Sequence, residues 1–340
     1  FGLRMGIRME LTKQNKGKKI AVTGVFSLLL IAMPFIFTNS PYIMTLLCFT
    51  EMYVIAASGL DVLYGYSGQI SFATAAFYGM GGYGSLLIHN HFGVPVLISM
   101  ILAAILSAIV GMILAFPVSK LRFAFLSLST IAFNHVVYQL ITRSPGGITG
   151  DFIGAFTDPL TIFGVSFKSS QMFYYFGLVC CLLFVSLKIL LTKSRVGRAF
   201  LAIKQNTHAA NGMGINVRKY KIYAFGFYGF YAAFAGAMYC HYVGYISPET
   251  ALQSQSVIYM IMILFGGICL NWGPVVGAVG IMIIQEVLSH AEQYQLLVYG
   301  ILLLIFILFL PRGVVGELKA LYVSLKAKKN NKEAEANAEG

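Results

Sequence analysis

The sequence predicts an all-α, polytopic integral membrane protein with about ten transmembrane helices. Hydrophobic residues make up 58% of the chain, charged residues only 11%, and the mean hydropathy is +0.78. A soluble domain carries roughly 25% charged residues, so most of this chain is unsuited to water. The apolar runs are continuous rather than alternating, which favours helices over a transmembrane barrel.

A helix needs about 20 apolar residues to cross a bilayer, and the chain offers ten such stretches. The third and the ninth are rich in glycine and are interrupted. The predicted spans are 20–37, 42–63, 69–90, 94–116, 122–141, 171–192, 219–241, 254–270, 273–289 and 294–310.

The lysines and arginines predict the orientation of these spans, because cytoplasmic loops carry an excess of them. If the chain starts in the cytoplasm, 22 of the 24 basic residues fall on the cytoplasmic side. Only Arg143 and Lys168 fall outside. The largest group of basic residues is assigned to the loop after the sixth span and runs from Lys188 to Lys221. Both termini are therefore predicted to be cytoplasmic.

The chain divides into three parts. Residues 1–19 are predicted to form a basic cytoplasmic tail, and the apolar run that follows lacks a convincing signal-peptide cleavage site. The transmembrane domain covers 20–316. Residues 317–340 are predicted to be a largely disordered cytoplasmic tail, because their end is polar and low in complexity. The five cysteines show no metal-ligand spacing with histidine, so no metal site is predicted.

Glycine-rich segments interrupt two predicted spans. Residues 79–84 match GxGxxG, but a dinucleotide site needs a preceding strand, and here the motif lies in an apolar helical run. Small residues that allow helices to approach closely are the better interpretation. The candidates for a pore or for helix packing, with the acidic residue of the second span, are Glu51, Gly65, Gly68, Gln69, Ser71, Gly79, Gly81, Gly266, Gly267, Gly273 and Gly277.

The sequence gives no positive support for an enzyme. It contains no GxxxxGK[ST], so it lacks the loop that would bind ATP phosphates. Acidic residues in the spans are few: Glu51, Asp61 and Glu286. A charge in the bilayer usually faces a cavity or a partner. Two interpretations of Glu51 are given equal weight: it is a structural carboxyl, or it lines the transport pathway.

The segment 194–215 is too polar to span a membrane and too patterned to be a plain linker. Ser194 is suited to cap a short helix, and Asn206 or Thr207 a second one. Gly212 or Gly214 would end the second helix. The small residues on it predict a knob that docks into a cleft of another protein, and the alternative is an amphipathic helix lying on the lipid surface.

These motifs together resemble the branched-chain amino-acid permeases of ABC importers, in particular the LivM-like kind. The resemblance rests on GLDVLYGYSGQISFATAAFYGMGGYG (59–84), SPGGITG (144–150), GRAFLAIKQNTHAANGMGINVRKYK (197–221) with GYISPE (244–249), and FGGICLNWGPVVGAVG (265–280) with LPRGVVG (310–316). It covers nearly all of residues 42–316, in the family's order.

The resemblance implies the membrane-spanning permease subunit of an ATP-driven importer in a bacterial inner membrane. The cargo would be branched-chain amino acids or similar small polar solutes. The implied partners are a second, LivH-like permease, two cytoplasmic ATP-binding subunits that hold ATP and Mg, and an extracytoplasmic binding protein. This chain would need no cofactor of its own.

The segment 194–215 would then be the loop that couples the permease to the ATPase. The residues assigned to it are Gly197, Arg198, Ala202, Ile203, Asn206, Ala209, Ala210, Gly212 and Gly214. Thr207, His208 and Asn211 stand where the family often has an acidic residue, so the implied contact rests on the small-residue knob rather than on a charge. Ala209, Ala210 and Gly212 are expected to form the contact itself.

A second hypothesis is an ion- or proton-coupled carrier built from inverted repeats. The glycine-rich segments 65–84 and 266–280 suit either class. The segment 194–215 separates the two hypotheses, because a carrier has no ATPase to dock. A carrier also usually needs more ionisable groups than this chain offers.

Overall fold

The computed structural model describes residues 40–119, 123–162, 165–289 and 294–309, together with the isolated positions 33, 34, 313, 316 and 317. Its helices are α2 (Pro41–Leu60), α3 (Thr74–Phe92), α4 (Val96–Val118), α5 (Phe123–Arg143), α6 (Ser170–Lys193), α7 (Arg195–Gln205), α8 (Thr207–Gly212), α9 (Val217–Val243), α10 (Gln253–Gly266), α11 (Gly273–Leu288) and α12 (Gln295–Phe309). The π-helix η1 (Asp61–Tyr66) continues α2.

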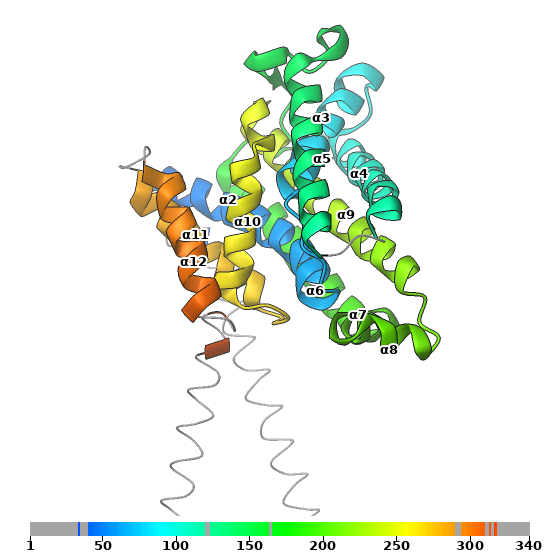
Figure 1. The fold of residues 1–340 in the computed structure, drawn as a ribbon. Coiled ribbons are helices and arrows are strands. Elements are labelled where there is room, and N and C mark those ends of the chain that lie inside the picture. Colours follow the sequence, from blue (N-terminus) through cyan, green and yellow to red (C-terminus); the bar gives the residue numbers. More distant parts are fainter. Residues whose placement is uncertain are drawn as a thin grey trace, which may run out of the picture.

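Short elements fill the connections at one end of the bundle. Strand β1 (Ala155–Phe156) pairs antiparallel with β4 (Tyr245–Ile246), which follows α9. Strand β2 (Thr161–Ile162) pairs with β3 (Val165–Ser166). The 3-10 turns η2 (Pro145–Gly147), η3 (Asp151–Ile153) and η4 (Pro248–Ala251) complete this end. The green segment near residue 150 and the pair α7–α8 lie at opposite ends of the molecule (Figure 1).

The predicted all-α membrane fold is confirmed. The second to tenth predicted spans each fall on a helix, while the first span and the two terminal tails lie outside the described residues apart from isolated positions. In the described part, four helical stretches are long and apolar enough to cross a bilayer: Pro41–Tyr66, Val96–Val118, Phe125–Arg143 and Ser170–Lys193. The apolar helices α10 and α11 are shorter.

The surface agrees with a membrane environment. Along α4, large apolar side chains such as Ile105, Leu106 and Ile113 are exposed, and α6 shows the same pattern with Leu183 and Leu190. Soluble monomers rarely expose contiguous apolar patches of more than a few hundred Å². These helices are therefore suited to contact lipid or another apolar helix.

Helix α9 forms the centre of the bundle and contacts α2, α3 and α4. It approaches α3 closely, because both helices have glycine at the contact. A Cβ on Gly81 would lie 1.9 Å from the carbonyl oxygen of Ala233, and a Cβ on Gly236 would lie 1.9 Å from that of Tyr78. The two backbones touch, so neither glycine has room for a side chain.

The third predicted span differs from the expectation, because its helix begins at Thr74 rather than at residue 69. Residues 68–73 are non-helical and lie inside the protein. Backbone of this kind is tolerated at membrane depth only where protein or a cavity satisfies its polar groups. Here the N–H of Phe72 donates to Thr130 Oγ1 at 3.0 Å, and the Nε2 of Gln253 donates to the carbonyl of Phe72 at 3.3 Å.

The first turn of α3 is capped from other helices. The N–H of Ala75 donates to Ser256 Oγ on α10 at 2.9 Å, and the N–H of Ala76 donates to Asn134 Oδ1 on α5 at 2.8 Å. The first N–H groups of a helix have no partner within it, so these side chains satisfy them. Helices α3, α5 and α10 are thereby tied together at a buried point.

Candidate functional site: the helix pair 195–212

The first helix of the pair, α7, begins because a serine precedes it. Ser194 Oγ accepts hydrogen bonds from the N–H groups of Val196 at 3.1 Å and Gly197 at 3.4 Å. A serine in this position satisfies donors that the helix itself cannot bond. Capping by Ser194 was predicted from the sequence and is confirmed.

The second helix, α8, is capped by Asn206 rather than by Thr207. Asn206 Oδ1 accepts from the N–H groups of His208 at 3.0 Å and Ala209 at 3.1 Å. The helix ends at Gly212, and Gly214 follows with a φ of +81°, a conformation that favours glycine. Two capped helices with a one-residue break form a compact unit.

The pair has one face packed on the protein and one face free. Phe200 and Ile203 of α7 are buried, whereas Ala209 and Gly212 of α8 are exposed. Ala210 differs from the expectation, because its side chain is only 1% exposed and turns into the chain. The outward small-residue surface is therefore formed by Ala209 and Gly212, and a bulky residue at 210 would disrupt the pair itself.

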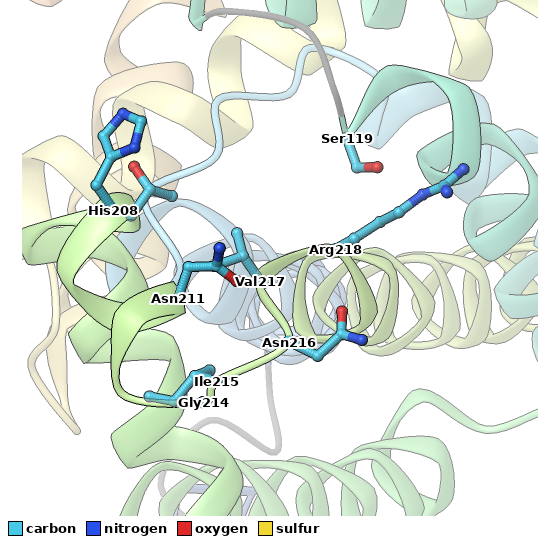
Figure 2. Close-up of a pocket in the computed structure, with 9 residues that line it drawn as sticks. Ser119, His208, Asn211, Gly214, Ile215, Asn216, Val217 and Arg218 are labelled. Carbon is cyan, nitrogen blue, oxygen red and sulfur yellow. The ribbon is translucent and has the colours of Figure 1, made fainter.

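A groove runs between α8 and the adjoining ends of α4 and α9. Its volume is about 560 Å³, and its lining is mostly polar or small. Figure 2 shows His208 and Asn211 on one side of this space and Ser119 and Arg218 on the other. The Arg218 guanidinium stacks on the ring of Phe116, 3.8 Å from its centre. The groove thus has a fixed basic edge.

Lys204 connects α7 to the membrane helices. Its Nζ donates to the carbonyl oxygen of Gly65 in η1 at 2.6 Å and lies 3.5 Å from Cys269 Sγ. The Cys269 thiol donates to the same carbonyl of Gly65 at 2.8 Å. Gly68, with a φ of +71°, packs against the stem of Lys204. A movement of α7 would therefore displace η1 and the α10–α11 connection.

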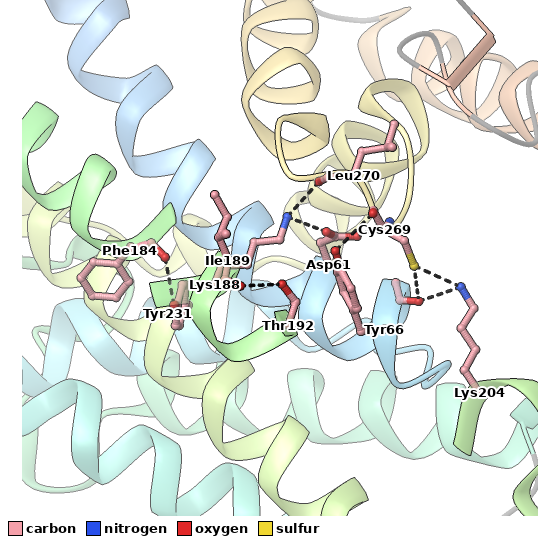
Figure 3. A network of polar contacts seen from close by, with 11 residues as sticks. Asp61, Tyr66, Phe184, Lys188, Ile189, Thr192, Lys204, Tyr231, Cys269 and Leu270 are labelled. Carbon is pink, nitrogen blue, oxygen red and sulfur yellow. Dashed lines mark hydrogen bonds and ion pairs between the residues drawn. The ribbon is translucent and has the colours of Figure 1, made fainter. Parts of the chain in front are cut away.

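A buried ion pair lies next to this contact (Figure 3). Lys188 Nζ of α6 lies 2.6 Å from Asp61 Oδ2 of η1, and both side chains are fully buried. The same Nζ donates to the carbonyl of Leu270 at 3.1 Å, while Asp61 Oδ1 accepts from the N–H of Cys269 at 3.0 Å. Buried charges persist only when paired and hydrogen-bonded, as these are.

The prediction that Lys188 is one of the loop charges is wrong. It lies within α6 and pairs with Asp61 across the bundle. With Lys204, Gly65 and Cys269, these two residues form a polar network that joins α6, α7, η1 and the α10–α11 connection (Figure 3). We call these five residues the junction.

Glu51 lies elsewhere, on the face of α2 that packs against α6. A Cβ on Gly177 would lie 2.0 Å from Glu51 Oε2, so the glycine leaves room for the carboxyl. Within the described residues, neither oxygen of Glu51 has a hydrogen-bond partner. Glu51 does not line the groove beside α8.

The remaining predicted residues separate into two regions. Gln69 Nε2 donates to Ser67 Oγ at 2.8 Å, and Ser71 Oγ donates to the Tyr228 hydroxyl at 3.4 Å; both belong to the non-helical segment before α3. Gly79 lies against Ala251 of η4. The second region is the α10–α11 contact, with Gly266, Gly267, Gly273 and Gly277.

Close backbone approach explains the glycines of the second region. A Cβ on Gly266 would lie 1.8 Å from the carbonyl oxygen of Gly273, and one on Gly277 would lie 1.9 Å from that of Met262. Gly267 has a φ of +102°. These glycines let the chain reverse tightly between α10 and α11, directly beside Cys269 of the junction.

The structural roles of Lys188, Asn134 and Ser256 were not predicted from the sequence. Asn134 and Ser256 are polar residues within apolar runs. This pattern indicates that their side chains form hydrogen bonds with buried polar groups. Their partners are 58 and 181 residues away in the chain, so the pairing itself left no local pattern.

The fold and the site define a class of protein: a polytopic helical membrane protein with a capped helix pair that is joined to its spans by a partly buried polar network. The chain belongs to the family of permease components of the branched-chain amino acid transport system, whose model matches residues 42–308. The resemblance seen in the sequence is thereby confirmed.

Several relatives are similar over most of the chain. The high-affinity branched-chain amino acid transport system permease protein LivM of Salmonella typhimurium is 27% identical over 86% of this chain and 74% of the relative. LivM of Escherichia coli K12 is 26% identical over 85% and 73%. A probable branched-chain amino acid transport permease protein LivH of Methanocaldococcus jannaschii is 26% identical over 79% and 90%. No solved structure matches the chain.

Proposed function

We propose that this chain is the permease subunit of an ATP-driven importer, and that it carries branched-chain amino acids or similar small polar solutes without hydrolysing ATP itself. The observation that carries the proposal is the exposed helix pair α7–α8, whose Lys204 bonds directly to the spans. A rigid outward surface linked to the membrane core suits a subunit driven by another protein. The names of the relatives support the substrate class.

The proposal includes the partners. Relatives of both the LivM and LivH kinds match this chain, which supports pairing with a second, similar permease. Two ATP-binding subunits would dock on α7–α8 and hold ATP and Mg, because the sequence lacks a P-loop. A soluble protein would deliver the solute at the opposite end, near β1 and β4.

We further propose that α7–α8 and both termini face the cytoplasm of a bacterium, with the chain in the inner membrane. The segregation of basic residues supports this orientation. Reassigning Lys188 to the interior of α6 does not weaken it, because the other basic residues of that group stay between Lys193 and Lys221.

Ala209→Trp tests the docking surface. The exposed alanine leaves room for the indole in this chain, but the indole would overpack a docked partner. Overpacking costs roughly 1–3 kcal/mol, so ATPase binding should weaken about five- to a hundredfold. Co-purification of the ATP-binding subunits and solute uptake by the reconstituted complex should fall together, while insertion of the chain stays normal.

Arg195→Trp is the matched control, since it places the same indole on an exposed position at the start of α7. It should assemble and transport much as the original chain does. The variant Ala209→Cys should react with an impermeant maleimide only from the cytoplasmic side. Normal assembly of Ala209→Trp, or labelling from outside, would exclude this surface as the coupling element.

The carrier hypothesis is the second candidate. The structure gives it one favourable feature, the non-helical backbone of residues 68–73 inside the bundle. A carrier has no use for an exposed, capped helix pair, so the importer explains more of the structure.

A further inference from the structure

We propose that a small cavity between α2, α3, α9 and α10 binds the ammonium group of the transported solute. The inference rests on the proposed function and adds to it a site and a chemical feature of the cargo. The cavity has a volume of about 160 Å³ and lies away from the helix pair and the junction, beside η4. That volume corresponds to roughly five water molecules, enough for the polar head of a small solute.

Four tyrosines form a continuous aromatic wall. The ring centres are 5.7 Å apart for Tyr53 and Tyr259, 5.9 Å for Tyr259 and Tyr78, and 5.8 Å for Tyr78 and Tyr239. Each residue comes from a different helix, so the wall exists only in the folded bundle. Faces of tyrosine rings attract cations, and organic ammonium groups are the ligands that aromatic cages favour.

The tyrosines of this wall leave polar groups accessible to a ligand. Tyr78 and Tyr259 are only 4% and 3% exposed, yet both line the cavity. Within the described residues, the hydroxyls of Tyr53 and Tyr239 form no hydrogen bond, so they remain free for a ligand. Tyr53 and Tyr239 are only partly buried and line the cavity, so their hydroxyls are accessible to an occupant with polar groups.

Glu249 supplies a negative charge at the rim. Its carboxylate takes part in neither of the two ion pairs of the described residues, Lys188–Asp61 and His89–Asp158. The turn that carries it is fixed, because Asn134 Nδ2 donates to the carbonyl of Ala251 at 3.0 Å and Gly79 lets Ala251 pack on α3. An exposed carboxylate on a fixed turn beside an aromatic wall favours a cation.

Gln255 adds a neutral donor to the lining, whereas the Thr250 hydroxyl donates to the carbonyl of Ser247 at 2.8 Å. The amide of Gln255 suits the carboxylate of an amino acid, while the rings and Glu249 take its ammonium. A carboxylate alone, or an uncharged amide such as urea, would find no matching charge. The cavity therefore favours zwitterions and alkylammonium ions over both.

Protection from labelling tests the site without relying on transport. Thr250→Cys places a thiol in the lining, and its reaction with uncharged N-ethylmaleimide is followed by mass spectrometry of the peptide that contains residue 250. The full-length chain, with its partner subunits, is held in lipid nanodiscs. Leucine and 3-methylbutylammonium should slow the reaction, whereas 4-methylpentanoate and urea should not.

Variants separate charge from aromatic contact. Glu249→Gln and Tyr53→Leu should each raise the alkylammonium concentration needed for half protection by about tenfold. Tyr53→Phe keeps the ring and removes only the hydroxyl, so it should raise this concentration less than Tyr53→Leu does. Glu286→Gln removes a carboxylate elsewhere and should leave it unchanged. Equal protection by 4-methylpentanoate, or no effect of Glu249→Gln, would overturn the inference.

The two proposals fail separately. If ammonium compounds protect residue 250 but the complete importer does not take up leucine, the cavity stands and the proposed substrate is wrong. The opposite result is that leucine is taken up, that no ammonium compound protects residue 250, and that Glu249→Gln does not change uptake. The proposed importer function would then hold, but the cavity would not be its binding site.

Discussion

Replacing Lys188 with methionine should destabilise the chain by about 3–5 kcal/mol, because it leaves the Asp61 carboxylate buried without its cation. Asp61 Oδ2 lies 2.6 Å from Lys188 Nζ, and both side chains are fully buried. The carbonyl of Leu270 would also lose its donor. The midpoint of thermal unfolding of the purified chain in detergent should fall clearly.

The double variant Asp61→Asn with Lys188→Met should recover much of that loss. It removes both charges and keeps an oxygen that accepts from the N–H of Cys269. The exposed Lys193, five residues further along α6, gives the control Lys193→Met, which should unfold like the original chain. Additive effects of the two single changes would show that the charges do not interact.

Gly81→Ala should produce the second large loss. The added methyl carbon would lie 1.9 Å from the carbonyl oxygen of Ala233, so α3 and α9 must separate. The strain costs at least about 1–3 kcal/mol and disturbs the centre of the bundle. The yield of monodisperse protein and the unfolding midpoint should both fall.

Gly84→Ala on the same helix is the matched control. Its methyl carbon would lie 3.3 Å from the Cβ of Ala103, so α3 and α4 would need to separate by only a few tenths of an ångström. Alanine also favours a helix by about 1 kcal/mol over glycine. If both substitutions were equally tolerated, the direct backbone contact of α3 with α9 would be refuted.

The sequence predicted best what depends on neighbouring residues. The apolar runs located the spans, and Ser194 and Asn206 were recognisable caps because they bond groups two and three residues ahead. The small residues of 207–212 predicted an outward knob, but only the structure shows that Ala209 faces out and Ala210 faces in.

What depends on distant residues could not be predicted. The pairing of Asp61 with Lys188 joins residues 127 positions apart, and the bond of Lys204 to Gly65 spans 139 positions. The late start of α3 at Thr74 follows from caps supplied by α5 and α10. A single sequence records none of these partnerships.

The energy source of uptake tests the central proposal most directly. Proteoliposomes that contain the complete importer are supplied with ATP at the face of α7–α8 and with the solute and its binding protein at the opposite face. Leucine uptake should require ATP and should persist when an uncoupler abolishes the proton gradient. Uptake that continues without ATP, or that collapses with the uncoupler while ATP is held constant, would contradict the assignment of this chain to an ATP-driven importer.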